Sequence, residues 1–236
     1  QGMILGNSAF IYRKSGTLEY LSKNLISDIK TDKVRIDIKY VDSENKVDIE
    51  ILKKMDKDFK YSLFVLEDEK FICVREQEKM SKSKFNVVNP DEICNQYGAD
   101  TLRMYEMFLG PIEQSKPWDT RGISGVHSFL KKFWNLFFNE GEINLSDTEP
   151  SKEELKSLHK TIKKVSEDIE KLSLNTCISS FMICINELSS MNCNNRLILK
   201  DLLILISPFA PHFAEELWSQ IGNSMSIVEE KYPKYE

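Results

Sequence analysis

Residues 79–90 read KMSKSKFNVVNP, and they mark the place where the periodicity of the sequence changes. Before them, apolar and polar residues alternate over much of residues 31–75, as at Val34 and Ile36, which is typical of strands with one buried face. After them, apolar residues recur every three or four positions, which is typical of helices. The sequence therefore predicts the α+β class, with a small antiparallel β-rich segment followed by an α-helical bundle.

The β-rich segment is predicted to contain several strands. The alternation runs on through Ile38 to Tyr40 and is repeated from Val47 to Ile51. Residues 61–66 and 70–74 are separated by three acidic residues. We expect these two runs to form a hairpin that leads the chain to residue 79.

The first helices can be placed from their capping residues. Asn89 can cap a helix that begins at Pro90, and Gly98 is expected to end it. Asp100 is then expected to cap a second helix, which runs to Leu109.

The remaining helices are predicted from aromatic and apolar spacing. Residues 120–139 are expected to form one helix with Phe129, Phe133, Trp134 and Phe137 facing inward. Further helices are predicted near 175–190, 194–206 and 211–222.

A long helix is predicted to follow the loop at residues 147–151. Ser151 and Glu154 have the spacing of a capping box. An apolar seam then steps by three and four residues through Leu155, Leu158, Ile162, Val165, Ile169 and Leu172.

Composition narrows the classes of protein to which the chain can belong. Its 236 residues can hold one large or two small domains, and the net charge of −5 argues against indiscriminate nucleic-acid binding. No apolar run is long enough to span a bilayer, and no secretory signal opens the chain. The five cysteines are scattered without C-x-x-C spacing, so we expect free thiols in a reducing cytosol and no metal site.

The pentapeptide Lys79-Met80-Ser81-Lys82-Ser83 carries groups that bind anions. It offers two mobile ammonium groups, two hydroxyls and several backbone N–H groups, which suit a polyphosphate. A solvated loop is the ordinary interpretation of an arbitrary peptide of this composition. The sequences on either side favour phosphate binding.

Residues 78–90, followed by YGADTLR at 97–103, resemble the second signature of class I aminoacyl-tRNA synthetases, most closely that of the leucyl enzymes. Residues 1–5 resemble the strand before the leucine-specific insertion of the bacterial members. Residues 118–134 resemble the beginning of their helical anticodon-binding domain, and residues 158–165 and 207–218 resemble two of its later helices. The likeness covers nearly the whole chain except roughly residues 14–70. Isoleucyl, valyl and methionyl synthetases are the nearest alternatives.

Two features depart from the family pattern. Phe85 stands where many members have Gly or Asn, which restricts the backbone of the loop. The first family signature, a His-x-Gly-His type motif that grips ATP, is absent, and the chain begins at Gln1 without an initiator Met. We therefore expect an internal or C-terminal fragment of a larger enzyme, inactive in leucine activation by itself.

The resemblance implies a division of the chain and a chemistry. Residues 1–78 would end the catalytic domain and carry the leucine-specific insertion, 79–118 would hold the loop and a connecting helical fold, and 119–236 would form the anticodon-binding-type bundle. The parent enzyme would be a cytoplasmic ligase that activates leucine with ATP and its accompanying Mg2+, forms leucyl-adenylate, and transfers leucine to tRNA(Leu). Its N-terminal catalytic, editing and C-terminal domains would be partners of this segment.

The resemblance also implies roles for the loop residues. Lys82 would be the catalytic group, because a cation that approaches the phosphates only during reaction lowers the barrier without trapping the substrate. The ATP-binding set would be Lys79, Met80, Ser81, Lys82 and Ser83.

Lysines on the predicted bundle are candidates for contact with tRNA phosphates. Four of them, Lys156, Lys160, Lys163 and Lys164, lie opposite the apolar seam, and three of these cluster without a compensating acid until Glu167. Lys131 and Lys132 form a second candidate pair. The alternative is a solvated helix face. A rival hypothesis for the whole chain is a non-catalytic RNA-binding or scaffold module that retains the synthetase bundle without its chemistry.

Overall fold

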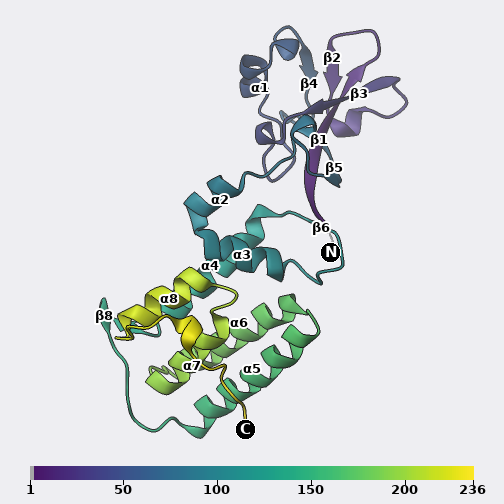
Figure 1. Ribbon diagram of the computed structural model, residues 1–236. Helices are drawn as coiled ribbons and strands as arrows, with labels where there is room; N and C mark the ends of the chain where they lie inside the picture. The colour runs from purple at the N-terminus through teal and green to yellow at the C-terminus, as the bar shows by residue number, and fades with distance from the viewer. Residues whose placement is uncertain (1–2) are drawn as a thin grey trace. The chain divides into compact units, whose positions relative to one another are not determined.

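The strand β1 (Ile4–Lys14) organises the first part of the computed structural model, which describes residues 3–236 (Figure 1). It pairs antiparallel with β5 (Val74–Lys79), with β3 (Thr31–Ile36) and with the short β2 (Glu19–Leu21). Two shorter pairings are parallel, namely β2 with β4 (Leu63–Val65) and β1 with β6 (Lys116–Pro117). Residues 3–88 and 115–118 make up this compact part, called here the sheet unit.

The two faces of β1 are covered differently. Ala9 and Ile11 are fully buried in an apolar cluster that includes Phe71 and Leu52. On the opposite face, two cations lie over the ring of Phe10. The Lys33 Nζ lies 3.9 Å and the Arg35 Cζ 4.5 Å from the ring centroid, distances at which cation–π attraction is favourable.

Two strand predictions for the sheet unit are wrong. Residues 47–51 do not form a strand, because α1 (Ile49–Met55) begins there with the Asp48 side chain accepting the Ile51 N–H at 3.0 Å. The alternation also stops at Ile36, and Ile38–Tyr40 form a 3-10 turn, η2. A side-chain cap outweighs a period-two pattern that spans only five residues.

The predicted hairpin of residues 61–66 and 70–74 is also wrong. β4 pairs with β2, whereas β5 pairs with β1, so the two runs join different strands of the sheet. Only an isolated bridge, Glu67 to Lys70, connects them locally. The other short turns of the sheet unit are η1 (Lys23–Leu25), η3 (Lys57–Phe59) and η4 (Lys82–Lys84).

Seven helices form the second compact part within the described residues, called here the helical unit and made of residues 89–114 and 119–236. They are α2 (Pro90–Tyr97), α3 (Ala99–Phe108), α4 (Thr120–Trp134), α5 (Lys152–Glu170), α6 (Leu174–Ser190), α7 (Arg196–Ile206) and α8 (Pro211–Gln220). A small hairpin, β7 (Phe138–Asn139) and β8 (Glu142–Ile143), follows α4, and a last turn, η5 (Ile227–Glu229), follows α8. The long helices α5 and α6 lie side by side (Figure 1). The predicted α+β class is confirmed.

The capping residues predicted the first residues of α2 and α5 correctly. Asn89 caps α2 with Pro90 at its first position, and Ser151 and Glu154 form the predicted capping box of α5. The seam of α5 is buried at Leu158, Ile162 and Val165, but Leu172 lies beyond the helix and is 58% exposed.

Two helix predictions are wrong. The helix predicted over residues 120–139 ends at Trp134, because the chain turns there into the β7–β8 hairpin, although Phe137 is still buried. Asp100 does not cap its own helix. Its buried carboxylate accepts the Phe213 N–H at 2.6 Å and pairs with His212 Nδ1 at 2.9 Å, so it caps α8 from a distance.

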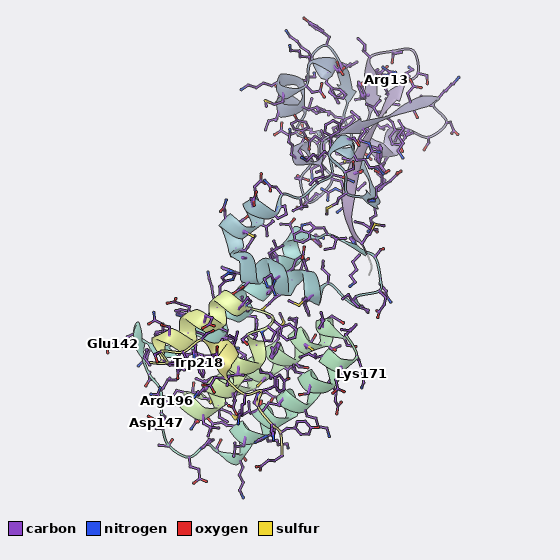
Figure 2. The ribbon with its side chains drawn as sticks, viewed as in Figure 1. Arg13, Glu142, Asp147, Lys171, Arg196 and Trp218 are labelled. Carbon is purple, nitrogen blue, oxygen red and sulfur yellow. The ribbon has the colours of Figure 1, made fainter. Side chains whose placement is uncertain are left out.

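Polar contacts between distant segments close the helical unit. Figure 2 shows Arg196 of α7 near Asp147 of the loop before α5, and their Nε–Oδ1 distance is 2.7 Å. Trp218 of α8, labelled in Figure 2, is buried. Its indole N–H donates to the Met225 carbonyl, which ties the residues after α8 to that helix. No helix within residues 3–236 is long and apolar enough to cross a membrane.

The capping box gives a test of the fold. Ser151→Ala removes the bond to the Glu154 N–H, and we expect the free energy of unfolding of the helical unit to fall by about 1 kcal/mol in urea titrations followed by circular dichroism. Ser173 is the matched control, because it occupies the N-cap of α6 without a side-chain cap bond. Equal losses for Ser151→Ala and Ser173→Ala would contradict this account.

Candidate functional site

The pentapeptide 79–83 forms a short loop at the end of β5. The chain leaves the strand at Lys79, turns through η4, and ends the turn at Phe85. Lys79, Lys82 and Ser83 are exposed, whereas Met80 is half-buried. In the part of the chain that the structure describes, no ion pair joins Lys79 or Lys82 to an acid. Both ammonium groups are thus available to an external anion.

Hydroxyl and amide groups hold the loop from within. The Ser81 and Ser83 hydroxyls lie 2.9 Å apart, so one donates to the other. The Ser81 N–H donates to the side-chain Oδ1 of Asn86 at 2.9 Å. Asn86 is 1% exposed, and its Nδ2 donates to the Ser8 hydroxyl at 2.9 Å and to the Lys79 carbonyl at 3.4 Å. A buried amide with partners on both of its ends fixes the base of the loop.

Glu78 lies directly before the loop and is held by three groups. Arg35 donates to both carboxylate oxygens, at 2.7 and 3.4 Å, and the Ser8 hydroxyl donates at 2.7 Å. The Lys84 Nζ lies 3.6 Å from the carboxylate. The Arg35 bonds, and then the Ser8 bond, lower the pKa of Glu78 to about 2.

The sign of this shift sets a pH window. Folding favours the ionised carboxylate, so its stabilising effect is fully present above the ordinary pKa of about 4.5. The effect is lost progressively as the pH falls from there toward 2. Between these two pH values the contacts of Glu78 with Arg35 and Ser8 weaken.

Two backbone features shape the loop from outside. Gly6 of β1 lies next to the loop, and a methyl group at this position would collide with the Asn86 carbonyl oxygen and lie 3.0 Å from the Met80 Cγ. Phe85 has a left-handed backbone with φ of 49°, and its carbonyl accepts the Ile38 N–H at 3.2 Å. Phe85, which stands where many family members have Gly or Asn, therefore adopts a backbone conformation that Gly and Asn adopt more easily than Phe.

Sequence reasoning did not find Gly6, Ser8, Arg35 or Asn86. One signal was available, since the triplet Gly6-Asn7-Ser8 interrupts an otherwise apolar stretch of β1 with small and polar residues. No local pattern marks Arg35, which reaches Glu78 only through the pairing of β3 and β5 with β1.

The lysines of α5 are all exposed, but they are not equivalent. Lys164 pairs with the buried Asp168 at 2.7 Å, and this acid directly follows Glu167. The acid lies one turn later on the same helix. Lys163 lies over the Tyr235 ring, with Nζ 5.9 Å from its centroid. Within residues 3–236 no ion pair involves Lys156 or Lys160.

The second lysine pair lies on α4. Lys132 donates to the Asn186 side chain of α6 at 2.7 Å, which reduces its freedom to meet another partner. Lys131 borders a cavity of about 350 Å³ that is also lined by His127, Trp134 and Phe213. The described residues bring together no group of three or more His, Cys, Asp or Glu side chains that could hold a metal ion.

The close approach at Gly6 gives a test of the site. Gly6→Ala would push its methyl group against backbone and should destabilise the sheet unit by roughly 1–3 kcal/mol, as overpacking usually does. The measurement is hydrogen exchange of the β1 amides under increasing urea. Gly125→Ala is the control, because nothing lies within 4 Å of the added methyl group and Ala favours the helix, so it should leave the β1 amides unaffected. Unchanged β1 exchange in Gly6→Ala would refute the predicted contact.

Comparisons with known proteins agree with the resemblance seen in the sequence. A family described as tRNA synthetases class I (I, L, M and V) matches residues 54–118, which include the loop. A second, described as the anticodon-binding domain of tRNA ligase, matches residues 151–236.

Individual relatives point to the leucine branch. The leucine–tRNA ligase of Flavobacterium psychrophilum is 58% identical over 99% of this chain and 24% of its own length, and that of Christiangramia forsetii is 56% identical over 100% and 24%. The chain thus spans about a quarter of the length of these relatives. Among solved structures, the LeuRS of Agrobacterium radiobacter, in a ternary complex with tRNA and LeuAMS, matches with a TM-score of 0.56 and 29% identity, over 66% of this chain and 22% of that one. The family predicted from residues 78–103 is confirmed, and the chain belongs to the leucine–tRNA ligases of the class I tRNA synthetases.

Proposed function

We propose that these residues form the part of a leucine–tRNA ligase that closes a phosphate-binding loop on ATP and braces tRNA(Leu). The observation that carries the proposal is the pair of exposed ammonium groups of Lys79 and Lys82, which form no ion pair with the described residues, on a loop with an anchored base. Leucine, ATP with its Mg2+, and tRNA(Leu) are the proposed substrates and partners. The proposed place of action is the cytoplasm.

The proposed reaction joins a leucine carboxylate oxygen to the α-phosphate of ATP, and the bond to pyrophosphate breaks. Negative charge grows on the phosphoryl oxygens and on the leaving group in the transition state. Lys82 is exposed at the start of η4, where its long side chain can follow that charge. An ammonium group that makes its best contact in the transition state raises the rate without holding the product. Lys79 would bind phosphate, and the Ser81–Ser83 hydroxyl contact would hold the turn.

Other parts of the ligase would supply the main ATP pocket, because the ATP-gripping first signature does not occur among these 236 residues. The three-part division at residues 78 and 118 is proposed from the family resemblance. The 236 residues by themselves are accordingly proposed to be inactive in ATP–pyrophosphate exchange.

Lys82 can be tested in a full-length leucine–tRNA ligase that carries this chain in place of its matching stretch, for example the F. psychrophilum relative. We refer to it as the segment-bearing ligase. Lys82→Ala should reduce ATP–pyrophosphate exchange by about 100- to 1000-fold, because it removes one charged contact to the transition state. Lys70→Ala is the control, since Lys70 is also exposed and closes a turn of the same unit. A loss below tenfold for Lys82→Ala would refute the catalytic role and favour the non-catalytic RNA-binding module.

The proposed tRNA contact of α5 predicts a change in salt dependence. Replacing Lys156, Lys160 and Lys163 by Gln in the segment-bearing ligase should flatten the slope of log affinity for tRNA(Leu) against log salt by about 2–3, given roughly 0.7–0.9 per phosphate contact.

A matched triple variant keeps the charge change constant. Lys30, Lys57 and Lys70 are exposed lysines of the sheet unit, and their replacement by Gln should leave the slope nearly unchanged. If both triple variants flatten the slope equally, or neither does, the α5 lysines are a solvated helix face.

A further inference from the structure

The loop is fixed at both of its ends, while its tip is free. At the first end, the Ser81 N–H is held by Asn86, which belongs to the segment just after the turn. At the second end, the Phe85 carbonyl accepts the Ile38 N–H. Lys82 and Ser83 lie between these two points and are exposed. Such an arrangement restricts where the Lys82 side chain starts without restricting where it can reach.

The hydrogen bond at the first end belongs to a chain of hydrogen bonds, and the donor and the acceptor of each can be assigned. The Glu78 carboxylate can only accept, so the Ser8 hydroxyl must donate to it. The Ser8 oxygen is then the acceptor for the Asn86 Nδ2, and the Asn86 Oδ1 is left facing the Ser81 N–H. A flipped amide would place Nδ2 against the Ser81 N–H, and the Asn86 oxygen against the Lys79 carbonyl.

The chain of bonds ends in a residue far away in sequence. Arg35 of β3 grips Glu78 with two N–H groups, and its guanidinium also lies over the Phe10 ring. Ser8 and Asn86, in the middle, are 0% and 1% exposed, so water cannot readily replace their bonds. Buried polar networks of this kind hold one geometry because every broken bond leaves an unsatisfied group.

We propose that Arg35 and Glu78 are positioning residues for Lys82, acting through Ser8 and Asn86 on the Ser81 N–H. The proposal rests on the proposed function only for its catalytic consequence. Neither residue touches substrate. Their effect is to keep the residue before Lys82 in one place, so that its ammonium group meets the growing charge in the correct geometry.

The kinetic consequence differs from that of lost binding. A loop with a loose base still reaches ATP, but spends less time in the reactive arrangement. The kcat should therefore fall while the KM for ATP changes little. A residue that served only global stability would not alter kcat once the folded enzyme is counted.

Two partly exposed members of the network can be changed with little risk to the fold, and each has a matched control. Glu78→Gln keeps the shape but puts an N–H donor against Arg35 or Ser8. Glu76→Gln is its control, because Glu76 lies two residues earlier on β5 and pairs with Lys33 instead. Arg35→Lys keeps the positive charge but loses the two hydrogen bonds that the guanidinium donates to Glu78. Arg13→Lys is its control, because Arg13 pairs with Asp32 on the same sheet.

The first measurement is amide hydrogen exchange of Ser81 in the 236-residue chain without ATP. We expect exchange to be about tenfold faster in Glu78→Gln and Arg35→Lys, the usual size for loss of one charge-assisted hydrogen bond, and unchanged in both controls. Because no substrate is present, this result reports the network even if Lys82→Ala refutes the proposed function.

The second measurement is ATP–pyrophosphate exchange by the segment-bearing ligase. We expect kcat to fall about tenfold in Glu78→Gln and Arg35→Lys with less than a twofold change in the KM for ATP, and no change in the controls. Unchanged Ser81 exchange in both variants would overturn the proposal. So would faster Ser81 exchange combined with an unchanged kcat, or an equal effect of the control substitutions.

Discussion

The antiparallel pairing of β1 with β5 determines where the loop begins. Leu5 lies opposite Lys79 and Gly6 opposite Glu78, so the last paired residue of β5 is the first lysine of the loop. Because side chains alternate along a strand, a shift of one residue would turn Glu78 away from Ser8 and Arg35. The burial of Ala9 and Ile11 on one face of β1 opposes such a shift. The apolar cluster of the sheet unit thus fixes the register on which the polar contacts of the loop depend.

The same contacts explain how two lysines stay available beside an acid. An ionised Glu78 with no partner would attract the ammonium groups of Lys79 or Lys82 across a few residues of flexible loop. Arg35, Ser8 and Lys84 already satisfy its oxygens. The remaining positive charge of the loop is therefore directed to solvent. Lys164 on α5 is not available in this way, because it pairs at 2.7 Å with Asp168, whose buried carboxylate forms no other ion pair among the described residues.

Local sequence signals predicted the helical unit better than the sheet unit. The starts of α2 and α5 were found because a cap and the N–H group that it satisfies lie within three residues of each other. The strand partners of β4 and β5 could not be found in this way, because pairing is decided by residues far apart in the chain. The loop lysines were recognised from their motif. Arg35 and Ser8 were not, because their role exists only once β1, β3 and β5 lie side by side.

Asp100 makes one helix of the bundle dependent on another for its cap. The N-terminus of α8 relies on a carboxylate carried by α3, and both belong to the helical unit. The family described as the anticodon-binding domain of tRNA ligase matches this chain from residue 151, after that carboxylate. Excising the matched stretch as an independent module would uncover the first turn of α8 and leave its amides to water. The start of the family match and the start of the compact helical unit are therefore different places in this chain.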